Sequence, residues 1–319
     1  MNRKDKKQLN IGIDIGGTNI RFALVDAKGA ILHRSRASSS IDGGRAKFCA
    51  RLLAGINEMR SFADSGGTGI AAIGVGVPGL IGRDGVIHSS VNMRPLEGLN
   101  LSAFLQEQAG LPAVCGNDAN LIALGEHVYG AGRQYASLMA ITIGTGLGSG
   151  LILNNTLWTG AGGFAAEFGH VTVDPEGAPC PCGNRGCLER YVSAGALVRY
   201  ARELLPPELV EDLGNSLDAQ KVADLAFQGK AGAAAAFARM GRWLGVALAS
   251  LINTLNLEAI IIGGGVSASF DLLLPELIDE IAQRSFTQIS GGCAIVQSEL
   301  GDDAGLLGGA ALAAARLFV

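Results

Sequence analysis

The chain has 319 residues, of which 48% are hydrophobic and 17% are charged, and its formal net charge is −4. This length suits one large or two ordinary domains, and the composition is that of a well-cored globular protein rather than a disordered chain. The charge balance, which lacks a sustained basic run, gives no reason to expect nucleic acid as a partner.

The first ten residues, MNRKDKKQLN, hold the only dense basic cluster. The residues that follow, IGIDIGGTN, place Asp14 and a glycine pair where a signal peptide would have its apolar core. Apolar runs elsewhere are rich in glycine and too short to span a bilayer as helices. We therefore expect a soluble, cytoplasmic protein without a membrane partner.

Residues 10–16 and 20–26 are apolar runs around GTN, a pattern that predicts two strands joined by a tight hairpin. The pattern returns near the middle of the chain, where SLMAITIG and GLILNNT flank TGLGS. Two hairpins with Gly/Thr-rich tips, so far apart in the sequence, predict two related halves that face each other.

Between the hairpins we predict a strand that enters a loop (GIAAIGVGVPGLI), a helix that ends at Gly110 (LSAFLQEQAG), and a strand, turn and helix (PAVCGNDANLIALGEHVYGAG). Beyond residue 190 we predict helices at SAGALVRYARELL, DAQKVADLAFQG and AAAAFARMGRWLGVALASLINTL, a strand at LEAIIIGGGVS, and a helix at FDLLLPELIDEIAQR. The last segment, DDAGLLGGAALAAARLF, predicts a small-residue helix that can pack closely.

This alternation of strands and helices predicts an α/β fold in two domains. We place the N-terminal domain at residues 1–120, completed by the C-terminal helix at 303–319. The second domain covers residues 121–302 and carries a cysteine-rich loop at 167–190.

The glycine-rich stretches are candidates for phosphate binding. The hexapeptide GVGVPG at 74–79 formally matches the dinucleotide fingerprint, but Pro78 lies inside it and no helix follows, so we reject it. The tips DIGGTN and IGTGLGSG are better candidates, because small residues in tight turns expose backbone N–H groups to an anion. Thr18 and Thr145 add hydroxyl donors, and Asp14 is placed to hold a Mg²⁺ ion that bridges phosphates.

Each tip alone could be an ordinary hairpin turn. The pair of tips, one carboxylate and a third glycine turn in IIIGGGVS together favour nucleotide binding.

The loop EFGHVTVDPEGAPCPCGNRGCLER, which starts at residue 167, holds three of the six cysteines and one of the four histidines. His170, Cys180, Cys182 and Cys187 have the spacing H-x9-C-x-C-x4-C, which suits tetrahedral zinc. A Cys3His set leaves no coordination position open, so we predict a structural zinc ion that orders the loop. The alternative is a cluster of reduced or redox-active cysteines beside a surface histidine.

Two glutamates flank the predicted zinc ligands. Glu167 lies three residues before His170, and Glu189 lies two residues after Cys187. A metal ion that fixes these ligands also fixes both carboxylates, so we expect a polar site beside the metal. Three other cysteines are interpreted as small core residues, namely Cys49, Cys115 and Cys293.

The motifs DIGGTN, GVGVPG, GNDAN, IGTGLGSG, EFGH and CPCGNRGCLE occur in the order seen in the ROK family of bacterial sugar kinases. The sequence resembles ROK glucokinases over essentially its whole length, and the cysteine motif is the most specific element. The resemblance implies a two-domain actin/hexokinase-like (ribonuclease H-like) fold with an active site between the domains. It also implies hexose and ATP as substrates, Mg²⁺ with the ATP, and a homodimer or homotetramer.

The resemblance further implies roles for individual residues. Asp118, in GNDAN, matches the general base for the sugar hydroxyl. The expected sugar contacts are Gly79, Asn92, Asn117, Asp118, Glu167, His170 and Glu189. The expected phosphate and nucleotide contacts are Asp14, Gly16, Gly17, Thr18, Thr145, Gly146, Gly264 and Gly265.

Asn117 and Asp118 are also good N-cap residues for the helix that follows, and capping is compatible with catalysis. The resemblance to ROK glucokinases favours glucose as substrate, but the sequence leaves N-acetylglucosamine, N-acetylmannosamine, mannose, fructose and allose open. Two rival functions are a sugar-responsive repressor and a non-catalytic sugar sensor. Repressors of the family carry a helix-turn-helix domain before DIGGT, for which nine residues before Asn10 are too few, and the presence of Asp14 and Asp118 favours an enzyme over a sensor.

Overall fold

The structure is a computed structural model that describes residues 8–90 and 93–315. Its chain divides into two compact units. Unit 1 contains the described residues up to Ala136, residues Gly150–Ala166 and the described residues from Glu299 onward. Unit 2 contains Ser137–Ser149 and Glu167–Ser298. The fold is α/β, as the alternating sequence pattern predicts.

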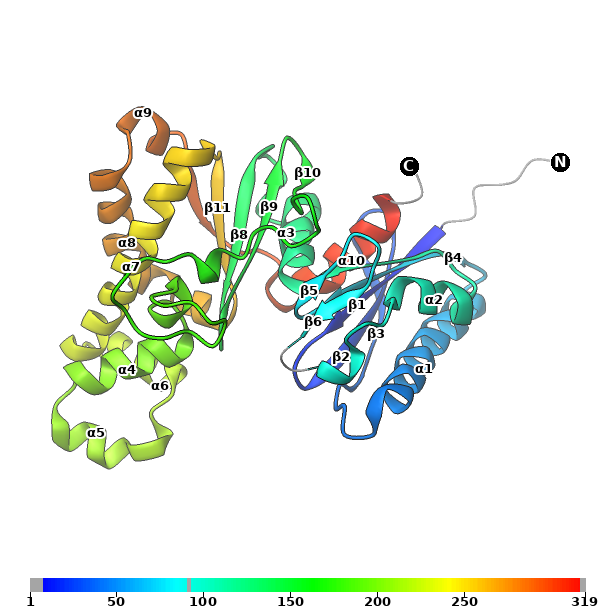
Figure 1. Cartoon of the computed structure of the whole chain (residues 1–319), viewed down its shortest axis with the longest axis horizontal. Helices are drawn as coiled ribbons and strands as arrows, with labels where there is room; N and C mark the ends of the chain where they lie inside the picture. The colour runs from blue at the N-terminus through cyan, green and yellow to red at the C-terminus, as the bar shows by residue number, and fades with distance from the viewer. Residues whose placement is uncertain (1–7, 91–92, 316–319) are drawn as a thin grey trace. The chain divides into compact units, whose positions relative to one another are not determined.

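Unit 1 is built on a five-stranded sheet with the order β3-β2-β1-β4-β7 (Figure 1). β1, β4 and β7 are parallel, whereas β2 and β3 form an antiparallel meander with β1. The strands are β1 (Gln8–Ile15), β2 (Asn19–Val25), β3 (Ile31–Ser38), β4 (Gly69–Val77) and β7 (Ala113–Asn117), with a separate short pair, β5 (Leu80–Ile81) and β6 (Ile87–Ser89). The helices are α1 (Gly44–Ser65), α2 (Leu101–Ala109), α3 (Asp118–Tyr129) and α10 (Ala304–Ala315).

Unit 2 contains most of a second five-stranded sheet with the order β10-β9-β8-β11-β12. Its strands are β8 (Leu138–Ile143), β9 (Leu147–Leu153), β10 (Thr156–Leu157), β11 (Ala259–Gly263) and β12 (Ala294–Gln297). The end of β9 and all of β10 belong to unit 1. The helices are α4 (Ala194–Leu204), α5 (Pro207–Leu213), α6 (Ala219–Phe227), α7 (Ala231–Leu255), α8 (Phe270–Arg284) and α9 (Thr287–Ser290).

The two sheets repeat one plan. In each sheet the first strand in sequence lies at the centre and continues through a glycine-rich tip into its second strand. Each first strand also pairs in parallel with a strand much later in the chain, β1 with β4 and β8 with β11. The prediction of two related halves built on hairpins is therefore confirmed.

Most predicted elements between and after the hairpins are present. Helix α2 ends at Gly110, which adopts the left-handed conformation with φ of 64°, as the sequence predicts. The predicted turn between β7 and α3 is wrong, because Asn117 is both the last residue of the strand and the N-cap of the helix. The long helix α1 and the edge strands β3 and β12 were not predicted.

Helix α10 packs against the sheet of unit 1 through glycine-to-backbone contacts. A Cβ atom at Gly12 of β1 or Gly74 of β4 would overlap backbone carbonyl oxygens of α10, and one at Gly308 of α10 would overlap that of Leu121. In Figure 1 the red helix α10 accordingly lies beside the blue strand β1, although they come from opposite ends of the chain. The prediction of a closely packed small-residue helix is confirmed.

The two units differ in part from the predicted domains 1–120 and 121–302. Residues 121–136 group with unit 1, because α3 packs along α10. Residues 150–166 also group with unit 1, since Gly150 lies directly against Ala123 and the start of α3. The domain boundaries themselves stay a prediction.

A buried glutamate in unit 1 lies near two of the four points where the chain passes between the units. Glu126 is fully buried, and its carboxylate accepts backbone N–H groups from Ala131 (3.0 Å) and Leu300 (3.0 Å). The chain first leaves unit 1 after Ala136 and re-enters it for the last time at Glu299, and between these points it visits unit 1 at Gly150–Ala166. One side chain therefore holds the backbone near the first and the last of these four connections.

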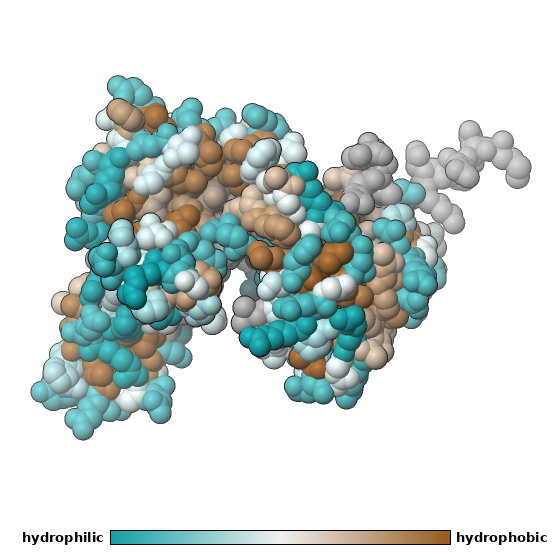
Figure 2. Space-filling view, in the orientation of Figure 1, coloured by the Kyte–Doolittle hydropathy of each residue, from teal (hydrophilic) through white to brown (hydrophobic). Residues whose placement is uncertain are grey.

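One helix in the described part of the chain, α7, is long and apolar enough to cross a membrane. Of its most apolar 18-residue window, 56% is buried inside the protein, as in the core helix of a soluble domain. The expectation that every apolar segment is too short is therefore wrong for α7, although this single helix is weak evidence for a membrane span. Figure 2 shows apolar residues gathered around the upper part of α7 and the neighbouring strands β8 and β11.

Candidate functional site

The parallel strands of unit 1 bring two carboxylates to one edge of the sheet. Asp14 of β1 lies in register with Gly76 of β4, and Gly76 lies in register with Gly116 of β7. Asp118 follows β7 directly as the first residue of α3. Because parallel strands end at a common edge, both aspartates lie at the carboxyl ends of the strands, where α/β proteins bind ligands.

Gly76 leaves the space between these two residues open. A Cβ atom at Gly76 would lie 3.4 Å from the Cα atom of Asp118 and 3.6 Å from Oδ1 of Asp14. Asp14 is 5% exposed and forms an ion pair with Arg21, its cross-strand neighbour, whose contacts both go to Oδ2. Oδ1 is the oxygen that faces Gly76.

Asn117 holds the loop beside Asp118. Its Oδ1 atom accepts the backbone N–H group of Asn120 as the N-cap of α3, and its Nδ2 atom donates to the carbonyl oxygen of Gly79 at 3.1 Å. Gly79 has a φ of 117°, which side chains rarely adopt. The predicted residue Asn92 lies outside the described residues.

A pocket of about 300 Å³ lies within unit 1 beside Asn117. It is lined mainly by apolar residues together with Arg83 and Asn120, whose buried Oδ1 atom has no hydrogen-bond partner among the described residues. The pocket includes neither Gly79 nor Asp118, so we do not assign it to the sugar.

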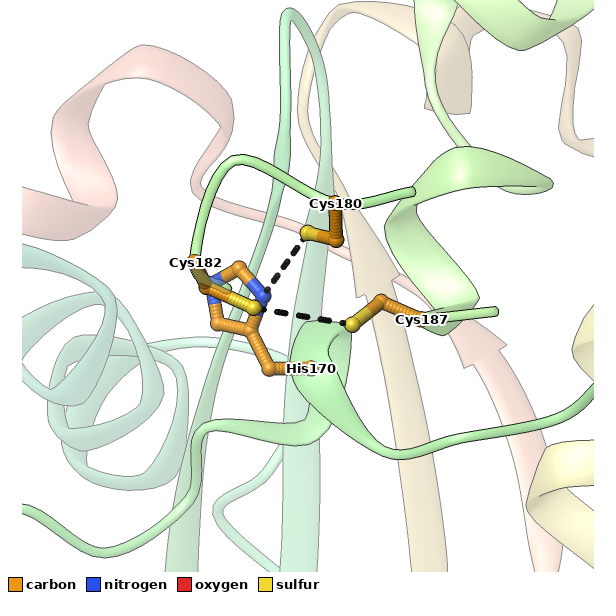
Figure 3. A group of neighbouring side chains, drawn as sticks. All are labelled: His170, Cys180, Cys182 and Cys187. Atoms are coloured by element: carbon orange, nitrogen blue, oxygen red, sulfur yellow. Dashed lines mark hydrogen bonds between the residues drawn. The ribbon is translucent and has the colours of Figure 1, made fainter. Parts of the chain in front are cut away.

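In unit 2 the four predicted zinc ligands come together (Figure 3). Their donor atoms all lie within 4.8 Å of one another. Sγ of Cys180 lies 3.8 Å from Nδ1 of His170, and Sγ of Cys182 lies 3.7 Å from Sγ of Cys187. Ligand atoms at zinc-bond distance from a tetrahedral centre are separated by about 3.5–3.8 Å, so this donor set fits a zinc ion.

The chemistry of the three thiols also fits a cation. Burial raises the pKa of Cys187 to about 12, whereas a hydrogen bond from the backbone of Asn184 lowers the pKa of the exposed Cys182. Three neighbouring thiolates would repel one another without a positive charge between them. A metal ion supplies that positive charge and offsets the repulsion between the thiolates.

Contacts within the loop and with α7 hold the loop around the Cys3His cluster in place. Gly186 has a φ of 66°, and a Cβ atom there would overlap the carbonyl oxygen of Asp174. The hydroxyl group of Tyr191 donates to Oδ2 of Asp174 at 2.9 Å, and the Tyr191 ring lies against Trp243 of α7, with 4.4 Å between the ring centroids. The loop is thereby attached to the longest helix of unit 2.

Two predicted sugar ligands lie beside the cluster. Glu167 immediately precedes the short 3-10 helix Phe168–His170, which is anchored where the N–H group of Phe168 donates to Oγ of Ser149 at 3.2 Å. Burial raises the pKa of Glu167, the neighbouring His170 opposes this rise, and the carboxylate of Glu189 adds to it. His170 and both glutamates are therefore close enough to interact electrostatically.

Glu189 also contacts the glycine tip between β8 and β9. Its Oε2 atom accepts the backbone N–H group of Leu147 at 2.9 Å, and a Cβ atom at Gly146 would overlap this oxygen. The third glycine turn lies close by, since a Cβ atom at Gly264, with its φ of 86°, would lie 2.5 Å from the carbonyl oxygen of Ile143. Thr145, Gly264 and Gly265 are exposed at these turns.

The predicted residues thus form one group in each unit. Unit 1 holds Asp14, the exposed tip Gly17–Thr18 with Gly16, Gly79, Asn117 and Asp118. Unit 2 holds the Cys3His cluster, Glu167, Glu189, Thr145, Gly146, Gly264 and Gly265.

Sequence reasoning missed three residues that position these groups, namely Arg21, Ser149 and Tyr191. The predicted hairpin brings Arg21 near Asp14, but only the observed register places the two directly opposite each other. The contacts of Ser149 and Tyr191 depend on tertiary folding and have no local signal.

Two sheets that share one strand plan and each carry a glycine tip, with two carboxylates at the strand ends of unit 1, define an actin/hexokinase-like α/β protein. The family model "ROK family" matches residues 10–316, and the chain belongs to this family. It is 35% identical to a glucokinase of Thermotoga maritima over 314 residues, which cover 96% of this chain and 98% of that protein. It is 31% identical to the xylose repressor of Bacillus subtilis over 95% of this chain and 76% of the repressor.

Among solved structures, a ROK family glucokinase from Streptomyces griseus in complex with glucose and AMPPNP matches with a TM-score of 0.78 and 34% identity. The match covers 96% of this chain and 99% of that chain. The two-domain fold expected from the sequence resemblance is therefore confirmed.

Proposed function

We propose that this ROK protein transfers a phosphoryl group from ATP to the 6-hydroxyl group of a hexose, with glucose as the first candidate. The observation that carries the proposal is the approach of Asp14 and Asp118 to one small space at the strand ends of unit 1. Phosphoryl transfer needs a group that orients the attacking hydroxyl and a group that holds the metal on the phosphates. The full-length similarity to glucokinases supports the same assignment.

Asp118 is the proposed general base. It is the first residue of α3, where the helix N-terminus favours a negative charge and the capped backbone fixes the carboxylate. Because phosphoryl transfer depends mostly on positioning and charge stabilisation, a carboxylate of ordinary basicity suffices as the acceptor of the hydroxyl proton.

The proposed sugar contacts are Gly79, Asn92 and Asn117 in the first half of the chain and Glu167, His170 and Glu189 in unit 2. His170 turns Nδ1 toward the cysteine sulfurs, so Nε2 lies on the other edge of its ring and is placed to bind a sugar hydroxyl group. The four carboxylate and amide side chains offer the acceptors that several sugar hydroxyls require.

The proposed phosphate contacts are the backbone and hydroxyl groups of the two glycine tips, at Gly16, Gly17 and Thr18 and at Thr145 and Gly146. Asp14 would hold the Mg²⁺ ion of Mg-ATP, which neutralises phosphate charge, through the oxygen that Arg21 does not contact. Gly264 and Gly265 would face the adenosine, since a turn without side chains admits a flat ligand.

The Cys3His cluster is the proposed structural zinc site. Four protein ligands leave no position open, so the ion would act on the fold of the loop and would not take part in the reaction. By fixing His170 and Cys187 it would place Glu167 and Glu189 beside the glycine tip.

A second candidate function is a non-catalytic sugar sensor. The similarity to xylose repressors over 95% of this chain supports it. A coupled assay that measures ADP release across a panel of hexoses and N-acetylhexosamines separates the two functions. ADP release with glucose well above that with the other sugars is the expected result. Sugar binding without ADP release for any sugar would establish the sensor instead.

A further inference from the structure

A hollow of about 400 Å³ lies on unit 2 between α7 and α8. It is lined by three arginines, a tryptophan and a valine, namely Arg239, Arg242, Trp243, Val246 and Arg284. The first four are spaced i, i+3, i+4 and i+7, so they share one face of α7. Arg284 is the last residue of α8. These residues lie outside the groups proposed for hexose, ATP and zinc.

A buried carboxylate orients two of the arginines. The side chain of Glu280 is 10% exposed, and its Oε1 and Oε2 atoms contact Nε of Arg242 at 3.0 Å and Nε of Arg284 at 2.5 Å. Gly245 makes this arrangement possible, because a Cβ atom there would lie 2.7 Å from Cβ of Glu280. Acidic side chains are seldom buried unless they are paired, so a nearly buried glutamate that pairs with two arginines differs from an ordinary ion pair on the surface.

The shared carboxylate leaves most of both guanidinium groups for a ligand. Each arginine contacts Glu280 through Nε, and within the described chain the terminal amino groups of Arg242 and Arg284 have no hydrogen-bond partner. Their side chains are 63% and 44% exposed. Two arginines and one glutamate leave a net charge of +1, so the hollow favours an anion.

The other walls suit the body of a ligand. Trp243 is half-buried and packs against the ring of Tyr191, whose hydroxyl group donates a hydrogen bond to Asp174. Arg239 is neutralised by Glu203 at 2.6 Å and lies 4.4 Å from the centre of the Tyr200 ring. The hollow therefore has a cationic end, formed by Arg242 and Arg284, and an aromatic wall at Trp243 on which the ring of a ligand can pack.

We propose that this hollow binds a phosphate monoester. The phosphoryl group lies between the guanidinium groups of Arg242 and Arg284, whose planar donor pairs match phosphate oxygens in a bidentate manner. The ring that carries the phosphate packs on Trp243. Sugar phosphates and nucleoside monophosphates share this chemistry, and the site is independent of the proposed kinase reaction.

Tryptophan fluorescence tests the proposal directly. The chain has two tryptophans, so Trp158→Phe leaves Trp243 as the only reporter. This protein is titrated with inorganic phosphate, a hexose 6-phosphate and a nucleoside 5′-monophosphate, each against sodium chloride at equal ionic strength. We expect a saturable change with phosphate and tighter binding of at least one ester, and the ester that binds more tightly identifies the source. Tighter binding of inorganic phosphate than of both esters would overturn the assignment.

A matched pair of variants locates the site. The side chains of Arg242 and Arg133 are both 63% exposed and each pairs with one glutamate, but Arg133 lies in unit 1. In the Trp158→Phe background, Arg242→Gln is expected to weaken binding about tenfold through loss of a charged hydrogen-bonding pair. Arg133→Gln is expected to leave it unchanged.

Loss of folding is separated from loss of binding by a second substitution. Arg284 lines the same hollow from α8, so Arg284→Gln is the second variant. Thermal melting followed by circular dichroism shows which of the variants remains folded. If a folded variant at position 242 or 284 binds the esters as tightly as the Arg133→Gln protein, or if no titration saturates, the proposal is wrong. The titrations contain neither ATP nor free sugar, so this failure would leave the proposed kinase function untouched.

Discussion

At the scale of single residues, the most informative position is Asp118, the proposed general base, which is the first residue of α3. Asn117 supplies the N-cap side chain of α3, so the carboxylate of Asp118 is not needed as the cap. Substitution of Asp118 therefore tests chemistry with little effect on the helix.

Asp118→Asn is expected to lower kcat by about 10²–10⁴-fold, because the amide keeps the shape but loses the base. KM for the hexose is expected to change less, since the amide still reaches the hydroxyl group. Steady-state kinetics with both substrates measures these effects. The matched control is Asp218→Asn, which alters the N-cap of α6 and should leave kcat unchanged. Near wild-type kcat in Asp118→Asn would refute the role of Asp118 as base.

The Cys3His cluster leads to a second prediction, which concerns the zinc content of the protein and its stability after metal removal. Elemental analysis is expected to find about one zinc ion per chain, and a strong chelator is expected to lower the melting temperature because metal binding supports the loop. Cys182→Ala should abolish stoichiometric zinc and lower the melting temperature, whereas Cys293→Ala should retain both. A stable, fully active preparation without zinc would contradict the structural role.

Thiol labelling with iodoacetamide at pH 7.5 provides an independent measurement on the chelated protein. Cys182 is exposed and is expected to react first. Burial raises the pKa of Cys293 to about 11, so its thiol stays protonated and unreactive until the pH approaches that value. Faster labelling of Cys293 than of Cys182 at neutral pH would show that the loop is differently arranged.

At the scale of elements, the packing of α10 on the strands of unit 1 depends on glycine. Gly74→Ala is expected to lower the free energy of unfolding by about 1–3 kcal/mol or more, because its Cβ atom overlaps the carbonyl oxygen of Gly309 and backbone cannot move as a side chain can. Gly69→Ala, on the same strand β4, has no atom within 4 Å of its Cβ position and should be neutral. Denaturant titration compares the two variants, and equal stability would exclude close backbone packing.

Sequence patterns predicted elements whose signals are local. The hairpin tips around Gly16 and Thr145, the end of α2 at Gly110 and the spacing of the Cys3His cluster all depend on residues close together in the chain. Contacts between distant segments left no such signal. The hydrogen bond from Leu147 to Glu189 and the grouping of residues 150–166 with unit 1 arise from tertiary folding, which local patterns do not encode.

At the scale of the whole molecule, Glu126 accepts backbone N–H groups near the first and the last of the four points where the chain passes between its units. Glu126→Gln is expected to lower the free energy of unfolding by about 2–3 kcal/mol, because an amide has one acceptor oxygen where the carboxylate has two. Hydrogen exchange should show lost protection at Ala131 and Leu300 before the sheet of unit 1 is affected. The control is Glu299→Gln, at an exposed residue. Unchanged protection of the Ala131 and Leu300 amides in Glu126→Gln would show that the Glu126 carboxylate does not hold them.

The position of α10 in the chain has a consequence for biosynthesis. A ribosome releases β1, β4 and β7 long before the helix that covers one of their faces, since α10 is the last helix of the described chain. Until α10 is synthesised, the nascent chain carries an apolar sheet surface without its covering helix, the kind of surface on which chaperones act. Premature termination of synthesis shortly before residue 304 would therefore release a protein that contains all five strands of the unit 1 sheet but lacks the helix that packs on them.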